Sequence, residues 1–315
     1  MSSPKICIIS GPTASGKTGL AIELVQKYGG EVINFDSLLL YKEINIGSAK
    51  PTIEEMQGVI HHMVGINSIS KPLNASDYMK RVIPLIKEIH AENKLIFLVG
   101  GSGFYLQAVL YGMFDSQTTP QEILDQSEKL YKDQGIEAFI QILKEVDPIS
   151  YKHYHANDHY RIRRAVEHFW HNQTPFSKVR ESMLEGREDN SNIKKYNWDI
   201  FHIYLDLPKD EHFKIIQKRT KQMLNLGLIE EVKSLLNKGF TGEEKPLQSI
   251  GYKECIAHLN GELSLEEMEE RINISTRQLA KAQRTWFKKI KKKEFHPLKD
   301  KARIDSEFKI FLNKE

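Results

Sequence analysis

The chain has 315 residues, of which 40% are hydrophobic and 28% are charged, as in ordinary water-soluble proteins. Two cysteines, Cys7 and Cys255, exclude a disulfide framework and a cysteine-based zinc site, and no apolar run approaches the ~20 residues of a membrane helix. The first predicted strand begins almost at the N-terminus, which leaves no room for a signal peptide before it. These features predict a soluble, cytoplasmic protein, and the length favours more than one domain.

Residues 11–18 form a complete G-x-x-x-x-G-K-[ST] loop, between the apolar run Lys5–Ile9 and the helical run Thr18–Lys27. In such a strand–loop–helix unit, backbone N–H groups and the helix N-terminus face a phosphate, and Lys17 adds a full charge. The hydroxyl of Thr18 stands where Mg²⁺ would bind. A chance match in a glycine turn is the alternative. The residues expected to bind a polyphosphate are Gly11, Pro12, Thr13, Ala14, Ser15, Gly16, Lys17 and Thr18.

The first 112 residues predict an α/β unit with a parallel sheet, because short apolar runs alternate with helical ones. The expected strands are Lys5–Ile9, Glu31–Phe35 and Leu95–Val99, and the expected helices are Thr18–Lys27, Pro51–Gly58 and Ser76–Ala91. Ligands bind at the carboxyl ends of such strands. The loops Gly11–Gly16, Asp36-Ser37 and Gly100–Gly103 should therefore converge on one site.

The metal site is not expected to be that of a standard nucleotide hydrolase. Such enzymes carry an aspartate at the end of an apolar strand. Here Leu95–Val99 is followed by Gly100-Gly101, and Asp206 follows a strand that Pro208 closes. Asp36, which follows the strand Glu31–Phe35, is the better-placed carboxylate.

After the α/β unit, residues 115–195 show helical spacing and no convincing strand. The expected helices there are Ile136–Val146 and Tyr160–His171, followed by a strand at Asp199–Leu207. Further helices are expected at Lys209–Leu226 and Ile229–Lys238, and a long one from the capping-box pattern at Ser264 towards residue 293. The fold class is thus a P-loop NTPase-like core with a helical insertion. The predicted domains are 1–114 for the first part of the core, 115–197 for the insertion, and 198–315 for core completion and basic C-terminal helices.

Positive charge is concentrated in two places, although the net charge is only +3. Residues 271–293 contain nine Lys or Arg and no acidic residue, and Tyr160-Arg161-Ile162-Arg163-Arg164 is a second basic group. Basic stripes with aromatic neighbours suit a phosphate backbone and unstacked bases. A solvated helix face explains a lysine run equally well, so composition alone leaves nucleic-acid binding open.

A long block at residues 36–51 makes the chain recognisable. It reads Asp-Ser-Leu-Leu-Leu-Tyr-Lys-Glu-Ile-Asn-Ile-Gly-Ser-Ala-Lys-Pro and resembles the D-S-x-x-x-Y-K-x-[ML]-[DN]-I-G-[TS]-A-K-P block of tRNA dimethylallyltransferases. The resemblance covers roughly residues 5–290. Other blocks match in family order: His61-His62, Gly100–Tyr105, Asn157–Glu167, Ile250–Glu254 and Thr276–Lys281. The family transfers a dimethylallyl group from dimethylallyl diphosphate to adenine at tRNA position 37.

The chemistry of this reaction suggests roles for particular residues. Adenine's exocyclic amine is a weak nucleophile, so the diphosphate must be neutralised and the amine proton removed. Asp36 is expected to stabilise the allylic carbon and accept the proton, unless it serves only as a helix cap or metal ligand. Arg219 resembles the arginine of the family's R-x-x-Q-M-L helix, which grips the diphosphate. The expected catalytic residues are Asp36, Lys17, Thr18, Arg219 and Ser102, with Mg²⁺ as cofactor.

The resemblance also implies an RNA-binding surface, since the target base must leave the anticodon-loop stack. Some of the insertion's arginines should contact phosphate, whereas others form local salt bridges, for example with Glu167. The expected tRNA-binding residues are Asp36, Ser37, Leu38, Leu39, Ser102, Tyr160, Arg161, Ile162, Arg163 and Arg164. The expected partners are tRNA and dimethylallyl diphosphate, with no membrane, and the protein is expected to be a monomer.

The sequence departs from the family pattern at several positions. Leu39 stands where many members carry Gln, and Gly65 stands where an Asp often follows the His-His pair. Ala282 replaces a common Arg, and Ser102 replaces the usual Thr. The first three put single polar contacts in doubt. The alternative functions are a free adenine-nucleotide prenyltransferase and a P-loop small-molecule kinase. A non-catalytic RNA-binding protein would leave the phosphate loop and Asp36 without a role.

Overall fold

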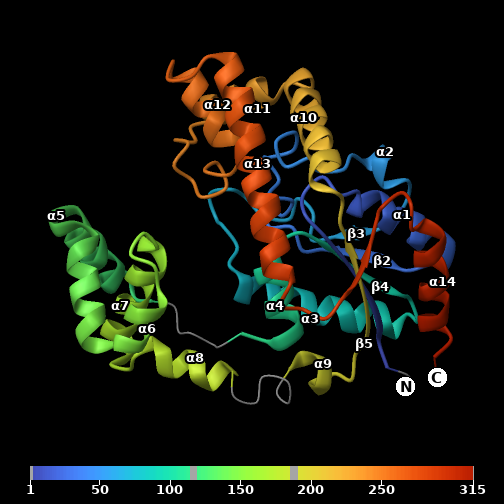
Figure 1. Cartoon of the computed structure of the whole chain (residues 1–315), viewed down its shortest axis with the longest axis horizontal. Helices are drawn as coiled ribbons and strands as arrows, with labels where there is room; N and C mark the ends of the chain where they lie inside the picture. Colours follow the sequence, from blue (N-terminus) through green and yellow to red (C-terminus); the bar gives the residue numbers. More distant parts are fainter. Residues whose placement is uncertain (1–2, 114–118, 185–190, 315) are drawn as a thin grey trace. The chain divides into compact units, whose positions relative to one another are not determined.

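A parallel sheet forms the centre of the larger of two compact units (Figure 1). The structure, a computed structural model, describes residues 3–113, 119–184 and 191–314. The larger unit comprises Met1–Gly112 and Lys195–Glu315, and the smaller one comprises Met113–Lys194. Among the described residues, no helix has both the length and the apolar character that crossing a membrane requires.

The sheet has six strands in the order β3-β2-β4-β1-β5-β6, and all neighbours are parallel. This confirms the predicted α/β class, and the central position of β1 places the phosphate loop in the middle of the sheet's carboxyl edge. β3 and β6 were not predicted, because two and three residues are too short to show a pattern. The strands are β1 (Lys5–Ser10), β2 (Glu31–Asn34), β3 (His61–His62), β4 (Ile96–Gly100), β5 (Asp199–Leu205) and β6 (Lys293–Phe295).

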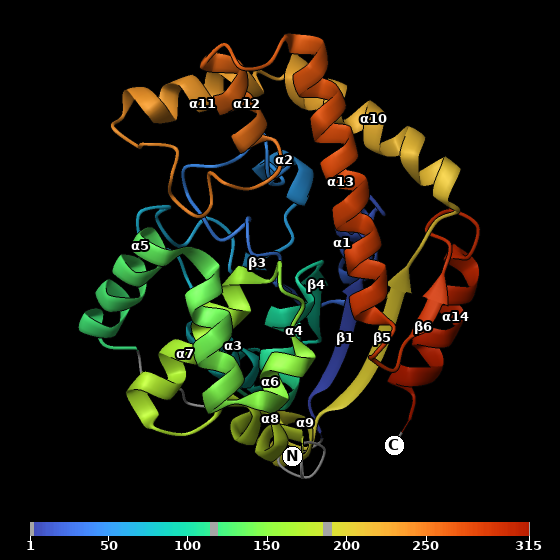
Figure 2. The same ribbon diagram turned by 60° about the vertical axis from the view of Figure 1, so that its left-hand side comes forward.

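Helices pack against the sheet and extend beyond its carboxyl edge (Figure 2). Apolar residues of α1 and α14 share one buried cluster with strand residues such as Phe97 and Phe201. The Phe308 ring lies 5.8 Å from both of those rings. The helices of this unit are α1 (Lys17–Tyr28), α2 (Ile53–Met56), α3 (Ala75–Ala91), α4 (Gly103–Tyr111), α10 (Lys209–Asn225), α11 (Leu228–Asn237), α12 (Tyr252–Leu259), α13 (Leu265–Phe287) and α14 (Lys301–Leu312).

The long basic helix is shorter than expected. The capping box at its start is confirmed, since Ser264 accepts from the Glu267 amide and its own amide donates to that glutamate. However, α13 ends at Phe287 and does not reach residue 293. Residue 293 instead begins β6, which pairs with β5 as the edge strand of the sheet and buries Phe295 at 2% exposure. Burial of this aromatic side chain favours a strand at residues 293–295 over continuation of the helix.

The smaller unit is helical in its described residues, which agrees with the absence of predicted strands. Its core contains Phe139, Leu143, Ile162 and Val166. Gly135, at φ 71°, breaks the first helix into two segments, because a residue with this positive φ cannot continue a right-handed α-helix. The helices are α5 (Gln121–Val146), α6 (Pro148–His153), α7 (His159–Asn172) and α8 (Phe176–Leu184), with α9 (Asn192–Lys195) at the return to the larger unit.

One histidine side chain is buried within the fold, on strand β5. His202 of β5 is 6% exposed, and its Nε2 lies 2.6 Å from the Ser10 hydroxyl while Nδ1 lies 3.2 Å from the Lys291 carbonyl. The carbonyl can only accept, so Nδ1 carries the proton and Nε2 accepts from Ser10. Burial lowers the pKa of His202 to about 4 because the charged ring would lose its hydration.

We therefore expect stability to decrease below neutral pH through His202. The unfolded chain binds this proton near pH 6.5, whereas folded His202 stays neutral until pH about 4. The free energy of unfolding should fall between those values, by about 3 kcal/mol in total from this residue. Urea unfolding at pH 7, 6 and 5 measures the slope. The His202→Gln protein should show a shallower slope, and an equal slope would contradict the assignment.

Candidate functional site

The phosphate loop connects β1 to α1 in the geometry that the sequence predicted. Gly11 and Gly16 have positive φ, and a Cβ on Gly11 would lie 2.3 Å from the Leu205 carbonyl oxygen, so that position requires glycine. Lys17 folds back on the loop, where Nζ donates to the carbonyls of Gly11 (3.1 Å) and Pro12 (2.9 Å). The Ser15 hydroxyl is buried without a partner among the described residues.

Thr13, in the middle of this loop, is held through all three of its polar atoms. Its amide donates to Gln283 Oε1 at 2.8 Å, and its carbonyl lies 2.8 Å from His212 Nε2. Arg219 Nη1 donates to the threonine hydroxyl at 3.2 Å. These partners belong to α10 and α13, so the C-terminal helices fix the backbone of the N-terminal loop.

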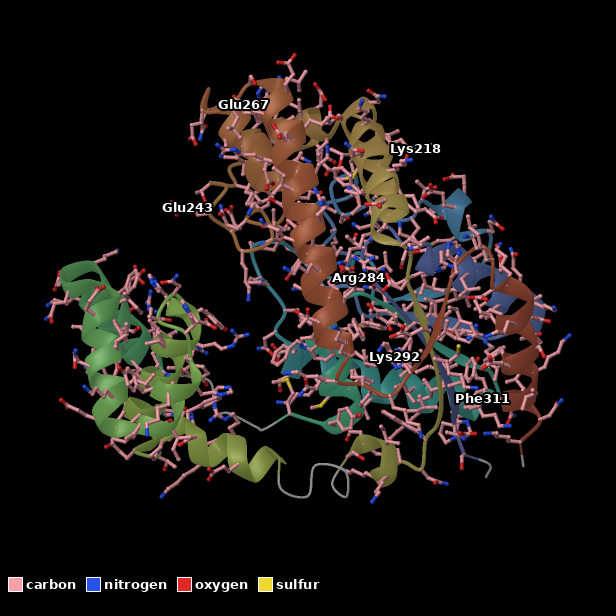
Figure 3. All side chains as sticks on the ribbon, viewed as in Figure 1. Lys218, Glu243, Glu267, Arg284, Lys292 and Phe311 are labelled. Carbon is pink, nitrogen blue, oxygen red and sulfur yellow. The ribbon has the colours of Figure 1, made fainter. Side chains whose placement is uncertain are left out.

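The ring of His212 is held in turn by an arginine that is paired with an aspartate. Arg284 on α13 (Figure 3) contacts Asp206 at 2.7 Å and donates to His212 Nδ1, also at 2.7 Å. Because Nδ1 accepts, Nε2 must carry the proton that goes to the Thr13 carbonyl. The pKa of His212 is lowered, chiefly by burial, which favours this neutral tautomer. Sequence reasoning missed His212, because a single histidine in a charged helix carries no signal. Arg284 was counted only as one of the basic residues of 271–293, and its pairing with Asp206 was not predicted.

Asp36 lies directly after β2, in a loop whose backbone is tightly held. The Asn34 side chain accepts from the Asp36 amide (2.8 Å) and donates to its carbonyl (3.0 Å). The Leu38 amide donates to Asp36 Oδ1 at 3.2 Å. Ser102 accepts from the Ser37 amide (3.0 Å), so in this structure its hydroxyl supports the loop. The strand-end loops therefore converge, as expected.

Two neighbouring cavities meet at Asp36. The loop-side cavity is bordered by Lys17, Thr18 and Leu39, and the helix-side cavity by Leu38 and apolar residues of α10 and α13. The two cavities share four lining residues: Thr13, Asp36, Ser48 and Arg219. Asp36 thus borders both spaces, with a phosphate loop on one side and apolar helix faces on the other.

Two partly buried cations, Lys17 and Arg219, lie near Asp36 on the wall of the loop-side cavity. Burial lowers the pKa of Lys17 to about 8, with Asp36 opposing this shift and Arg219 adding to it. Burial also lowers the pKa of Arg219, again opposed by Asp36. An anion entering the loop-side cavity would meet both cations in a region of low dielectric, where their attraction is stronger than in water.

The chain supplies few metal ligands of its own here. Among the described residues, no group of three or more His, Cys, Asp or Glu side chains could hold a metal ion. Thr18 and Asp36 border the same cavity and offer a hydroxyl and a carboxylate. That set fits Mg²⁺, which commonly takes one or two protein oxygens and completes its shell with water and substrate phosphates.

The basic group of the insertion is paired with carboxylates. Arg161 contacts Asp158, Arg163 contacts Glu128, and Arg164 contacts the buried Glu167. The pairing of Arg164 with Glu167 agrees with the expected local salt bridge.

Exposure separates the members of this basic group. Tyr160 is 69% exposed, but Ile162 is 2% exposed in the unit's core, which corrects the expectation that it contacts tRNA. The guanidinium of Arg163 covers the Tyr131 ring at 4.5 Å, so this residue serves packing as well as charge.

Comparison with known proteins identifies the family. A family model described as IPP transferase matches residues 39–290. The tRNA dimethylallyltransferase 2 of Geotalea uraniireducens is 38% identical over 285 residues, which are 90% of this chain and 89% of that protein. A tRNA dimethylallyltransferase of Caldanaerobacter subterraneus is 37% identical over 286 residues, with 90% and 89% coverage. The chain belongs to the IPP transferase family.

Solved structures agree with this assignment. A tRNA isopentenylpyrophosphate transferase of Staphylococcus epidermidis is 31% identical, with a TM-score of 0.71 and coverage of 99% of this chain and 100% of that one. A eukaryotic dimethylallyltransferase, solved acting on tRNA, gives a TM-score of 0.81 at 26% identity, over 99% and 81% of the two chains. The resemblance and the fold class inferred from sequence are confirmed, and this IPP transferase is a prenyltransferase.

Two departures from the family pattern lie together in the transferase. Leu39 borders the loop-side cavity, and its carbonyl accepts from the amide of Gly65 at 2.8 Å. Gly65 has a φ of 59°, which glycine adopts without strain. Ala282 is exposed on α13, next to the inward-facing Gln283. These substitutions leave the contacts to Thr13 and Asp36 in place.

The lowered pKa of Lys17 predicts a pH limit on anion binding by this transferase. Below pH about 8 the amine is charged and attracts diphosphate, whereas above it the free protein loses that charge. The affinity for inorganic diphosphate, measured by calorimetry from pH 7 to 10, should therefore fall above pH about 8. In the Lys17→Arg protein the guanidinium stays charged, so the decline should disappear. The same decline in both proteins would exclude Lys17 as its cause.

Proposed function

We propose that this transferase moves the dimethylallyl group of dimethylallyl diphosphate to the exocyclic amine of adenine at position 37 of tRNA. The observation that carries the proposal is the junction of two cavities at Asp36 and Arg219, with Lys17 and Thr18 of the phosphate loop bordering only the loop-side cavity. A donor whose diphosphate lies in the loop would present its allylic carbon at this junction. An adenine that enters from the other side would meet it there.

The junction supplies what this substitution needs. The amine nitrogen forms a bond to the allylic carbon while the bond from that carbon to the diphosphate oxygen breaks. Lys17 and Arg219 neutralise the leaving diphosphate, which lowers the barrier to bond breaking. Asp36 stabilises the positive charge on the allylic carbon and accepts the amine proton. The main-chain contacts of Asn34 and Ser102 hold the Asp36 loop in position during the reaction.

We also propose Mg²⁺ as the cofactor, held by Thr18 and, through its carboxylate, by Asp36. When bound, the ion would neutralise further charge on the diphosphate. The remaining loop groups act without it, because N–H groups of residues 11–16 and the N-terminus of α1 favour an anion by themselves. A cytoplasmic monomer is the form that we propose for the enzyme.

The helical insertion is proposed to bind the anticodon stem-loop. Its exposed candidates are Tyr160 and the outward-facing guanidinium groups of Arg161 and Arg164. An unpaired base can stack on an exposed tyrosine, and phosphates can compete for arginines that are paired at the surface. A free nucleotide would need no such surface, which favours tRNA over a free adenine nucleotide as acceptor.

The test is transfer of labelled dimethylallyl diphosphate to an anticodon stem-loop RNA, with Mg²⁺ and without ATP. We expect label on the RNA only when adenine is present at position 37. The Asp36→Ala protein should be slower by about 10²- to 10⁴-fold, the usual contribution of a general base. Asp36→Asn keeps the size of the side chain and should be similarly slow.

Other outcomes would point to the alternatives. Label on free adenine nucleotide but not on RNA would favour the nucleotide prenyltransferase. Phosphate transfer from ATP would favour a kinase. Near-normal rates in both Asp36 variants would keep the reaction and remove Asp36 as the base.

A further inference from the structure

A single carboxylate holds three consecutive backbone amides beside the cavity junction. Glu231, in the first turn of α11, accepts from the amides of Asn45 (3.1 Å), Ile46 (2.9 Å) and Gly47 (3.4 Å). Successive N–H groups that converge in this way form a site that favours an anion. Here the protein supplies that anion itself, from a helix that lies far away in sequence.

Tyr252 completes this arrangement from α12. Its hydroxyl donates to Glu231 Oε1 at 2.6 Å, and its ring lies against Gly47. A Cβ on Gly47 would lie 2.4 Å from Tyr252 Cε2, so a larger residue there would displace the ring. Gly47 and Tyr252 both belong to sequence blocks that match the family, and neither has a role in the chemistry proposed above.

The segment held by Glu231 leads directly to the site. Gly47 borders the helix-side cavity, and the next residue, Ser48, borders both cavities. Lys50 binds oxygen atoms of the same loop: its Nζ donates to the Lys42 carbonyl (3.3 Å) and to Asn45 Oδ1 (2.8 Å). Glu231 thus holds the amides of residues 45–47, and Lys50 holds the Asn45 side chain.

We propose that Glu231 is a positioning residue for the transfer reaction, acting through residues 45–48 on the wall that the two cavities share. The inference rests on the proposed function. Glu231 does not border either cavity, so it reaches the substrates only through the backbone that it holds. Without it, Ser48 and its neighbours would shift relative to Asp36, and the two reacting groups would be aligned less often.

The chain offers a matched control. Glu230 is the preceding residue in the same helical turn and is exposed. Glu231→Gln and Glu230→Gln therefore remove the same charge from the same end of α11, with an equal effect on the helix dipole. Only Glu231→Gln replaces an accepting oxygen by an NH₂ group, which then faces either the amides of residues 45–46 or the donors from Gly47 and Tyr252.

The first measurement is amide hydrogen exchange of residues 45–47. We expect exchange in Glu231→Gln to be faster than in wild type on the order of tenfold, from the loss of charge-assisted hydrogen bonds. Glu230→Gln should exchange like wild type. Equal exchange in the two variants would overturn the inference, whether or not the wild-type protein transfers a prenyl group.

The second measurement is steady-state transfer to the stem-loop RNA. Poor alignment of bound substrates should lower kcat of Glu231→Gln by about tenfold, while KM for both substrates changes by less than about threefold. Tyr252→Phe keeps Glu231 and should cause a smaller change in the same direction. The double variant should be no worse than Glu231→Gln, since both act through one carboxylate.

Two results would count against the positioning role. Normal kcat in Glu231→Gln, together with faster exchange, would show that the segment does not affect catalysis. Additive effects in the double variant would show that Tyr252 and Glu231 act separately. Absence of transfer in wild type, with the expected exchange pattern, would count against the proposed function alone.

Discussion

The structure of this site depends on the way in which Thr13 is held. A glycine-rich loop has many accessible backbone conformations, and only some of them direct its N–H groups towards a phosphate. Thr13, at the loop's centre, forms hydrogen bonds through its amide, carbonyl and hydroxyl with Gln283, His212 and Arg219 respectively. The loop thus owes its shape to two helices that lie outside the β1–α1 unit.

The same helices supply the second half of the site. Arg219 contacts Thr13 and also borders both cavities, and Gln283 borders the helix-side cavity while its amide donates to the Gly101 carbonyl at 3.0 Å. A change in the packing of α10 on α13 would therefore alter the loop and the helix-side cavity together. The partly buried ion pair between Arg284 and Asp206 opposes such changes, because separating the two groups would leave both charges without a partner in a region of restricted hydration.

Sequence reasoning succeeded where the determinants are local. The phosphate loop, the main strands and the capping box at Ser264 each depend on residues within one turn or strand, and each is found where it was predicted. The position of Asp36 also followed from a rule about strand ends. The family resemblance added Arg219, whose approach to Thr13 depends on a partner 206 residues away.

The remaining features depend on tertiary contacts that no local pattern records. His212 and Glu231 look like ordinary helical residues, and their importance comes from backbone atoms of distant loops. The end of α13 and the strand β6 are decided by pairing with β5 and by burial of Phe295. Ile162 was assigned to the RNA surface because of its charged neighbours, although its own side chain packs inward.

The spacing of the Thr13 contacts along the chain has a consequence for synthesis. The loop is translated first, yet its three partners follow after 199, 206 and 270 residues, and β1 gains its β5 neighbour only from residue 199 onwards. The helical insertion, whose contacts are local, can pack earlier, because short-range contacts form quickly. A nascent chain therefore carries the phosphate-loop sequence long before the distant residues that hold Thr13. The full set of contacts that holds Thr13 therefore forms only after α13 has been synthesised, because Gln283 lies near the end of that helix.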